Sequence, residues 1–223
     1  MPVGWMYELE MLTGPALSGL LEGGASVAVV PFGSIEHHAG HLPIGADALL
    51  ADAVGREVAR ALDAVVAPTV RVGCAEPHRR SPGTLTLRAD TLADVAVELA
   101  EGLARQGFRP IVLVSTHGGN RAALDAAVSR LSPAPGGAVV RAPQGDVGSQ
   151  PGAHSGEWLT SVMLALRPDL VGLENAGSDL AHELREADAQ RGARHIERFV
   201  ASIVAAVRAA AQVDSGLRRR SDG

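Results

Sequence analysis

Short runs of apolar, β-branched residues alternate along this chain with longer alanine- and leucine-rich segments whose apolar positions recur with a helical period. Runs of the first kind favour buried strands, and segments of the second kind favour amphipathic helices. The pattern predicts strands at 26–32, 65–67, 70–72, 84–87, 111–115 and 138–140, and helices at 46–62, 89–106, 119–131, 156–167 and 187–211. Such alternation is typical of a mostly parallel sheet with helices on both faces, so we expect an α/β fold.

The chain has no obvious internal boundary. Its 223 residues suit one sizeable α/β core, and neither a linker nor an internal repeat divides them. We therefore expect a single domain over residues 1–223, with an N-terminal lead-in at 1–14 and a disordered tail at 213–223.

Composition excludes some chemistries. All 20 basic residues are arginine, so the chain has no lysine for a Schiff base, for pyridoxal phosphate or for a P-loop. The net charge of -5, without a basic stripe, argues against nucleic acid as a partner. Cys74 is the single cysteine and forms no internal disulfide; we interpret it as a small buried residue rather than a nucleophile. No segment is long and apolar enough for a membrane span, and we expect a cytoplasmic protein.

The most distinctive segment is residues 33–47, which follow the predicted strand 26–32. This segment contains Glu36, His37, His38, His41 and Asp47. Imidazole and carboxylate groups are the ligands that borderline divalent metals prefer. The alternative is a polar turn whose histidines are solvated.

Two further loops carry similar residues. His117 follows the strand 111–115, and His154 stands at the entry to the helix 156–167. In a parallel sheet these loops leave at the same edge, where function gathers. Glu36 and His38, two residues apart, point to one side of an extended segment, and Asp47 could bridge two ions. His117 could bind metal, and His154 could pass a proton to a leaving nitrogen. His182 and His195 we expect at the surface.

These clusters, in this order, resemble the creatininase (creatinine amidohydrolase) family. Residues 33–47 follow its motif Gly-Ser-x-Glu-x-His-Gly-x-His-Leu-Pro-x-x-Thr-Asp, with Ala39 and Ala46 replacing a glycine and the threonine. Residues 115–120 match Asn-Gly-His-Gly-Gly-Asn, and residues 154–161 match His-Ala-Gly-x-x-Glu-Thr-Ser. Residues 78–84 echo Glu-His-x-x-Phe-Pro-Gly-Thr more weakly.

The resemblance implies a three-layer α/β/α sandwich with a two-metal centre that hydrolyses C–N bonds. It implies metal ligands at Glu36, His38, Asp47 (bridging) and His117, and a catalytic role for His154. It also implies a homo-oligomer, commonly a hexamer. The family includes a branch of peptidases that act in mycofactocin maturation.

The chain departs from the family at its last acidic ligand. The usual glutamate before Thr-Ser is Leu159 here, and the place two residues after His117, where creatininase itself has a glutamate, is Gly119. Glu157 is the acid left in that motif, so we expect it to serve as the fifth metal ligand within the catalytic site. The alternative is an exposed first-turn glutamate favoured by the helix dipole.

Three functions remain open from the sequence. The leading hypothesis is a metal-dependent amidohydrolase, in which two divalent ions direct hydroxide attack on an amide, lactam or formamide of a small molecule. A second is a peptidase that trims a small modified peptide, and a third is a non-catalytic binding protein with a degenerate metal site. Mixed nitrogen and oxygen ligands suit zinc, manganese and iron alike.

Overall fold

The computed structural model describes residues 7–131, 139–142 and 154–221. At its centre lies a five-stranded sheet of order β1-β3-β2-β4-β5 in which every pairing is parallel. The strands are β1 (Tyr7–Glu8), β2 (Ala28–Phe32), β3 (Val65–Val66), β4 (Ile111–Ser115) and β5 (Val139–Arg141). The mostly parallel sheet predicted from the sequence is confirmed.

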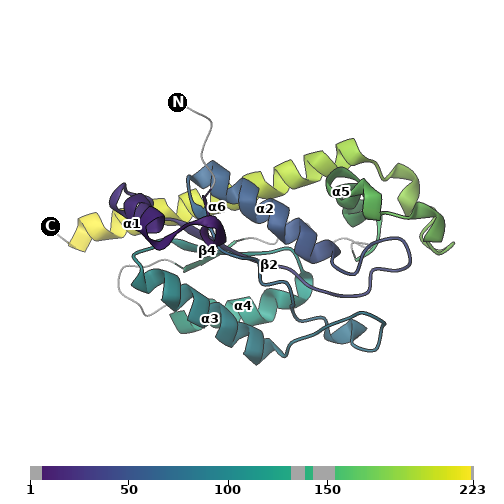
Figure 1. Cartoon of the computed structure of the whole chain (residues 1–223), viewed down its shortest axis with the longest axis horizontal. Helices are drawn as coiled ribbons and strands as arrows, with labels where there is room; N and C mark the ends of the chain where they lie inside the picture. Colours follow the sequence, from purple (N-terminus) through teal and green to yellow (C-terminus); the bar gives the residue numbers. More distant parts are fainter. Residues whose placement is uncertain (1–6, 132–138, 143–153, 222–223) are drawn as a thin grey trace.

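Helices cover both faces of this sheet (Figure 1). On one face lie α2 (Ala46–Leu62), α5 (Glu157–Leu166) and α6 (Ala189–Ser221); on the other lie α1 (Gly14–Glu22), α3 (Ala89–Arg105) and α4 (Arg121–Leu131). In the part of the chain that the structure describes, six short 3₁₀ turns lie at Leu9–Met11, Glu76–His78, Gly118–Asn120, Pro168–Leu170, Leu173–Asn175 and Glu183–Glu186. The arrangement confirms the predicted three-layer α/β/α sandwich.

The core is divided between the two faces by the alternation of strand side chains. In β2, Val29 packs toward α2, α5 and α6, whereas Ala28, Val30 and Phe32 pack toward α3 and α4. All of these side chains are fully buried. A parallel strand with helices on both faces needs apolar residues at every position, which is why β2 is a continuous apolar run.

The structure differs from the sequence prediction in the loops and at the two ends. Residues 70–72 and 84–87 form only isolated bridges, Phe32 with Val70 and Ile35 with Leu85, and not full strands. The expected lead-in at 1–14 contains β1 and the 3₁₀ turn Leu9–Met11, and helix α1, which the pattern did not predict, begins at Gly14. Helix α6 continues to Ser221, where the pattern predicted an end near 211 and a disordered tail; leucine and the arginines there are good helix formers.

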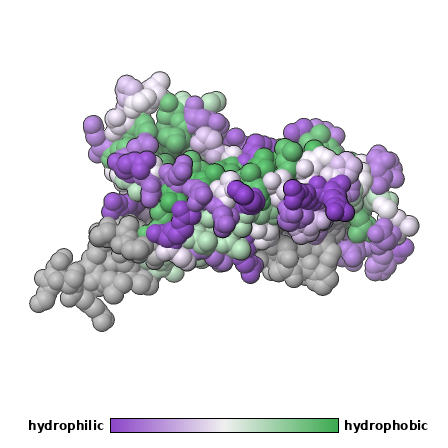
Figure 2. All heavy atoms as spheres, turned by 90° about the horizontal axis from the view of Figure 1, so that it is seen from below, coloured by the Kyte–Doolittle hydropathy of each residue, from purple (hydrophilic) through white to green (hydrophobic). Residues whose placement is uncertain are grey.

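The surface mixes polar and apolar residues. Figure 2 shows the face seen from below, on which hydrophilic side chains are interspersed with smaller apolar areas. Within the residues that the structure describes, no helix has the length and apolar character to cross a membrane.

The order of the strands reverses direction between β2 and β4. From β2 the chain passes to β3 on one side, and then, through α3, to β4 on the other side of β2. Helices α2 and α3 therefore depart to opposite faces, and the loops after β2 and β4 separate at the carboxyl ends of the strands. In open α/β sheets this reversal of strand order is where ligands bind.

Candidate metal centre

The loop after β2 is brought back over the sheet by a close approach of helix α2. A Cβ on Gly33 would lie 2.5 Å from the Cα of Ala48, so only glycine permits the first turn of α2 to pack here. The preceding residue of that turn is Asp47, whose own carbonyl accepts a hydrogen bond from the Thr116 hydroxyl, 2.7 Å away. The packing thus places the carboxylate of Asp47 beside the loops after β2 and β4.

Asn120, fully buried, ties three loops together. Its side-chain amide donates to the carbonyl of Gly33 after β2 (2.9 Å), and its Oδ1 accepts from the backbone of Cys74, which follows β3 (2.9 Å). Asn120 itself follows β4. One side chain therefore fixes the relative positions of the segments that carry the polar cluster.

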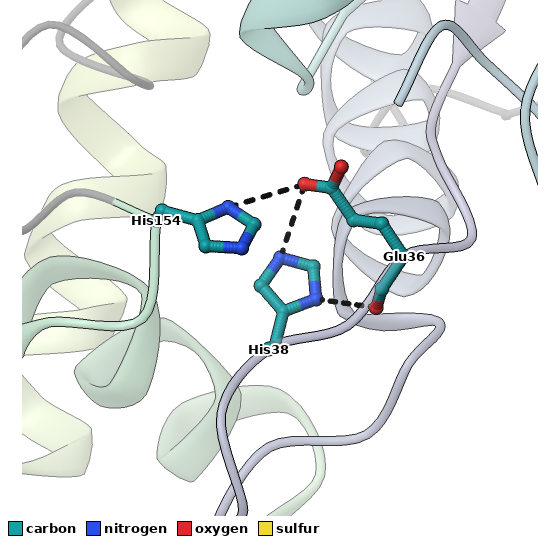
Figure 3. A group of neighbouring side chains, drawn as sticks. All are labelled: Glu36, His38 and His154. Atoms are coloured by element: carbon teal, nitrogen blue, oxygen red, sulfur yellow. Dashed lines mark hydrogen bonds and ion pairs between the residues drawn. The ribbon is translucent and has the colours of Figure 1, made fainter. Parts of the chain in front are cut away.

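The cluster centres on two buried carboxylates, Glu36 and Asp47, which are 1% and 4% exposed. Oε1 of Glu36 lies 3.6 Å from Nε2 of His38, 3.3 Å from Nδ1 of His117 and 3.2 Å from Nδ1 of His154 (Figure 3 shows the first and third of these). Asp47 lies between His38 and His117, with Oδ1 3.7 Å from the former and Oδ2 3.0 Å from the latter. The three loops predicted to converge do converge.

Each of the three histidines has its second ring nitrogen fixed by a backbone carbonyl. His38 Nδ1 bonds the carbonyl of Glu36 (3.0 Å), His117 Nε2 that of Cys74 (2.9 Å) and His154 Nε2 that of His37 (2.8 Å). A carbonyl only accepts, so these nitrogens carry the proton of the neutral ring. The other nitrogen, with its lone pair, then faces a carboxylate. Lone pairs that meet in this way require a cation between them, and a carbonyl-fixed tautomer is typical of metal-binding histidines.

Electrostatics support a cation at this position. Burial opposes ionisation of Glu36, but the imidazoles of His117 and His154 outweigh it and lower its pKa well below the ordinary range. Burial also disfavours a charged His117, yet Asp47 and Glu36 raise its pKa to about 10. In the absence of metal, protonated His117 and His154 supply the positive charge that balances the two carboxylates.

Several atoms of the cluster have no hydrogen-bond partner although they are buried. These are both carboxylate oxygens of Glu36, Oδ2 of Asp47 and Nε2 of His38. Buried polar atoms are nearly always satisfied, so their convergence on one point indicates a ligand. Among the described residues, two groups have the geometry to hold an ion: Glu36, Asp47 and His117, and Glu36, His38 and His154.

Glu157 is not brought into the cluster. Its Oε1 accepts from the hydroxyl of Ser161 (2.7 Å) and lies 3.5 Å from Nε of Arg191 and 3.6 Å from Nε2 of His195. The side chain is thus turned toward α6. Leu159 is 3% exposed and packs in the core between the sheet and α6.

The other histidines differ in burial. His41 is buried, with Nε2 3.0 Å from the hydroxyl of Thr160, and His182 is exposed as expected. His195, which we expected at the surface, is partly buried because it packs beside Trp158 and Glu157. Sequence reasoning missed His78, whose ring stacks on that of His154. The weak match of residues 78–84 to a family motif was its only signal.

Comparison with known proteins agrees with this geometry. Residues 10–218 match the family model described as "Creatininase: Creatinine amidohydrolase". The chain is 35% identical over 168 residues to a mycofactocin precursor peptide peptidase of Mycolicibacterium smegmatis, covering 70% of this chain and 64% of that protein. It is 31% identical over 178 residues to a creatinine amidohydrolase of Pseudomonas putida, covering 68% of each. The chain spans slightly less than two thirds of the mycofactocin peptidases that it matches.

Solved structures show the same fold. A structure named "Creatininase Mn" superimposes with a TM-score of 0.77 at 24% identity, covering 92% of this chain and 98% of that one. A putative creatinine amidohydrolase from Bacteroides fragilis gives a TM-score of 0.73 at 23% identity, covering 93% and 96%.

Proposed function

Because the chain belongs to the creatininase family, we propose that it is a metal-dependent hydrolase of C–N bonds in amide, lactam or formamide groups of small molecules. One observation carries the proposal. Three histidines, each with one ring nitrogen fixed by a backbone carbonyl, turn the other ring nitrogen toward two buried carboxylates at the reversal of strand order.

The proposed ligands divide between two divalent ions. Glu36, Asp47 and His117 would hold one ion. His38 would hold the second together with Asp47, whose carboxylate lies between His38 and His117. Zinc, manganese and iron all suit this mixture of nitrogen and oxygen donors. When bound, such ions polarise the substrate carbonyl and lower the pKa of water, so that attack proceeds at neutral pH.

We propose His154 as the catalytic residue that moves a proton. Its Nε2–H donates to the carbonyl of His37, which leaves Nδ1, 3.2 Å from Oε1 of Glu36, as the atom that can take up and release a second proton. The carboxylate of Glu36 raises the pKa of His154, and this effect is larger than the opposing effect of burial. The side chain is 41% exposed, so this proton can reach the leaving nitrogen of a substrate.

The role of Glu157 as a fifth ligand, expected from the sequence, is not part of this proposal. To reach an ion, its carboxylate would have to leave Ser161, Arg191 and His195. We therefore treat its ligand and catalytic roles as a separate hypothesis, tested by substitution in the Discussion.

A peptidase is the second candidate. Four relatives at 32–35% identity are named mycofactocin precursor peptide peptidases, which favours a short, modified peptide as substrate. A peptide bond is itself an amide, so the same metal centre serves both reactions.

The test is hydrolysis by metal-free protein reloaded with zinc, manganese or ferrous iron. Creatinine, N-formyl amines and short peptides are offered, and products are followed by mass spectrometry. We expect at least one substrate to be cleaved only after metal is restored, and its class decides between the two candidates. Failure to bind any of the three metals would refute the proposal and favour a binding protein.

Assembly is proposed from family resemblance, and location and partners are proposed from composition. We propose a homo-oligomer, a hexamer by that resemblance, and we propose a cytoplasmic location without nucleic-acid or membrane partners from the charge and hydropathy of the chain. Light scattering coupled to size-exclusion chromatography measures the number of chains directly.

A further inference from the structure

His78, a residue outside both metal-binding groups, lies with its ring against His154. The two ring planes are inclined by only 6°, and their centroids are 4.1 Å apart. On its other face the ring of His154 stacks on His38, at 4.6 Å and 22° (Figure 3). His154 is therefore the middle member of a stack of three imidazoles.

The three rings come from three different loops. His38 belongs to the loop after β2, His78 to the loop after β3, and His154 to the entry of α5. The Ile35–Leu85 bridge and the hydrogen bond from the His37 N–H to the Thr84 hydroxyl (3.0 Å) already join the first two loops, and the stack links both to the entry of α5.

His78 is well anchored in its own loop. Its backbone N–H donates to the carbonyl of Ala75 (2.9 Å), and its carbonyl accepts from Ser81 (2.8 Å). The hydroxyl of Thr86 in turn accepts from Ala75 (2.9 Å). These hydrogen bonds fix the backbone of the turn that carries His78. Its ring can therefore restrict the movement of the His154 ring against which it lies.

His154 has two polar contacts of its own. The hydrogen bond from Nε2 to the carbonyl of His37 and the contact of Nδ1 with Glu36 fix two points of the ring, but they leave the ring free to tilt about the line between them. Contact with rings on both faces removes this freedom. An aromatic pair changes such an equilibrium by up to about tenfold. The orientation that brings Nδ1 to Glu36 therefore depends on both stacking partners.

We propose that His78 is a positioning residue, whose ring holds the His154 imidazole against His38 so that Nδ1 of His154 faces Glu36. The consequence for proton transfer rests on the proposed function, whereas the orientation of the ring does not.

The experiment compares His78→Ala, which removes the stacking ring, with His78→Phe, which keeps a flat ring without nitrogens. His182→Ala, at an exposed histidine far from the cluster in sequence, is the matched control. Zinc-loaded proteins labelled with nitrogen-15 in histidine are studied by NMR, and the Nε2–H signal of His154 is assigned by its loss in His154→Gln. Zinc content is measured in every variant.

We expect the His154 Nε2–H proton to exchange with water about tenfold faster in His78→Ala, consistent with the loss of one ring contact. In His78→Phe and His182→Ala the rate should stay near that of the parent, with zinc content unchanged throughout. On a substrate that the parent cleaves, His78→Ala should lower kcat with little change in KM, and His78→Phe should restore it.

An unchanged exchange rate in His78→Ala would overturn the proposal. So would loss of zinc in that variant, which would make His78 a support of the metals, or failure of His78→Phe to restore the parent rate. If the parent cleaves no substrate, the proposed function fails, but the exchange measurement still decides whether His78 orients His154.

Discussion

Replacement of Glu36 by glutamine removes one charge from the centre of the cluster while keeping its shape. Oε1 of this residue is within 3.6 Å of a nitrogen of each of the three fixed histidines. At the 3.3 Å that separates it from His117, two unit charges interact by about 5 kcal/mol at an effective dielectric constant of about 20. If only about a third of this survives desolvation, metal affinity falls at least about tenfold, since 1.4 kcal/mol corresponds to a factor of ten.

The assay is competition for zinc between the protein and a chromophoric chelator. Glu157→Gln is the matched control, because it makes the same chemical change at a glutamate that faces α6 instead of the cluster. Its ion pairs are partly solvated and long, so it should cost under about 1 kcal/mol of stability and leave zinc binding unchanged. Circular dichroism checks that both variants fold.

Two results would refute this reasoning. Zinc affinity of Glu36→Gln equal to that of the parent would remove Glu36 from the ligand set. Loss of one zinc equivalent in Glu157→Gln would show that Glu157 leaves Ser161 and Arg191 to become the fifth ligand, as the sequence alone suggested.

Three further outcomes are expected. The pKa of His117 in the metal-free protein is raised from 6.5 to about 10, so protonation of this ring stabilises the fold fully below pH 6.5, and the stabilisation is lost as pH rises through 10. Thermal unfolding of the metal-free protein should show this fall in stability. Zinc, which needs the neutral ring, should abolish it. Gly119→Ala would place a Cβ 2.1 Å from the carbonyl of Cys74 and 2.5 Å from Nε2 of His117, so zinc affinity should drop, whereas Gly118→Ala, with nothing within 4 Å, should not change it. Ile203→Ala empties a fully buried core position and should lower the free energy of unfolding by about 2–5 kcal/mol in denaturant titration; a loss below about 1 kcal/mol would contradict the packing described.

The elements that the sequence predicts best are those whose signals are local. The helix at 46–62 and the strand at 111–115 match α2 and β4 at both ends. Apolar spacing and flanking glycines or charges define such elements without reference to the rest of the chain. Residues 84–87 alternate as a strand would, but they serve a loop in which Thr86 accepts a hydrogen bond from Ala75, which the pattern alone does not indicate.

The residues of the site likewise fall into those that the sequence predicts and those that it does not. Glu36, His38, Asp47, His117 and His154 follow strands or begin helices, so topology alone is enough to predict that they meet. The direction of Glu157 depends on Arg191 and His195 of a distant helix, and the stacking of His78 depends on how two loops fold together. Neither contact leaves a trace in local periodicity.

The most direct test of the metal centre is the zinc content of the metal-reloaded parent protein, measured by inductively coupled plasma mass spectrometry against protein concentration. The proposed ligand set predicts two equivalents per chain, both retained in Glu157→Gln. A parent protein that retains no zinc, with the cluster folded as described, would contradict it.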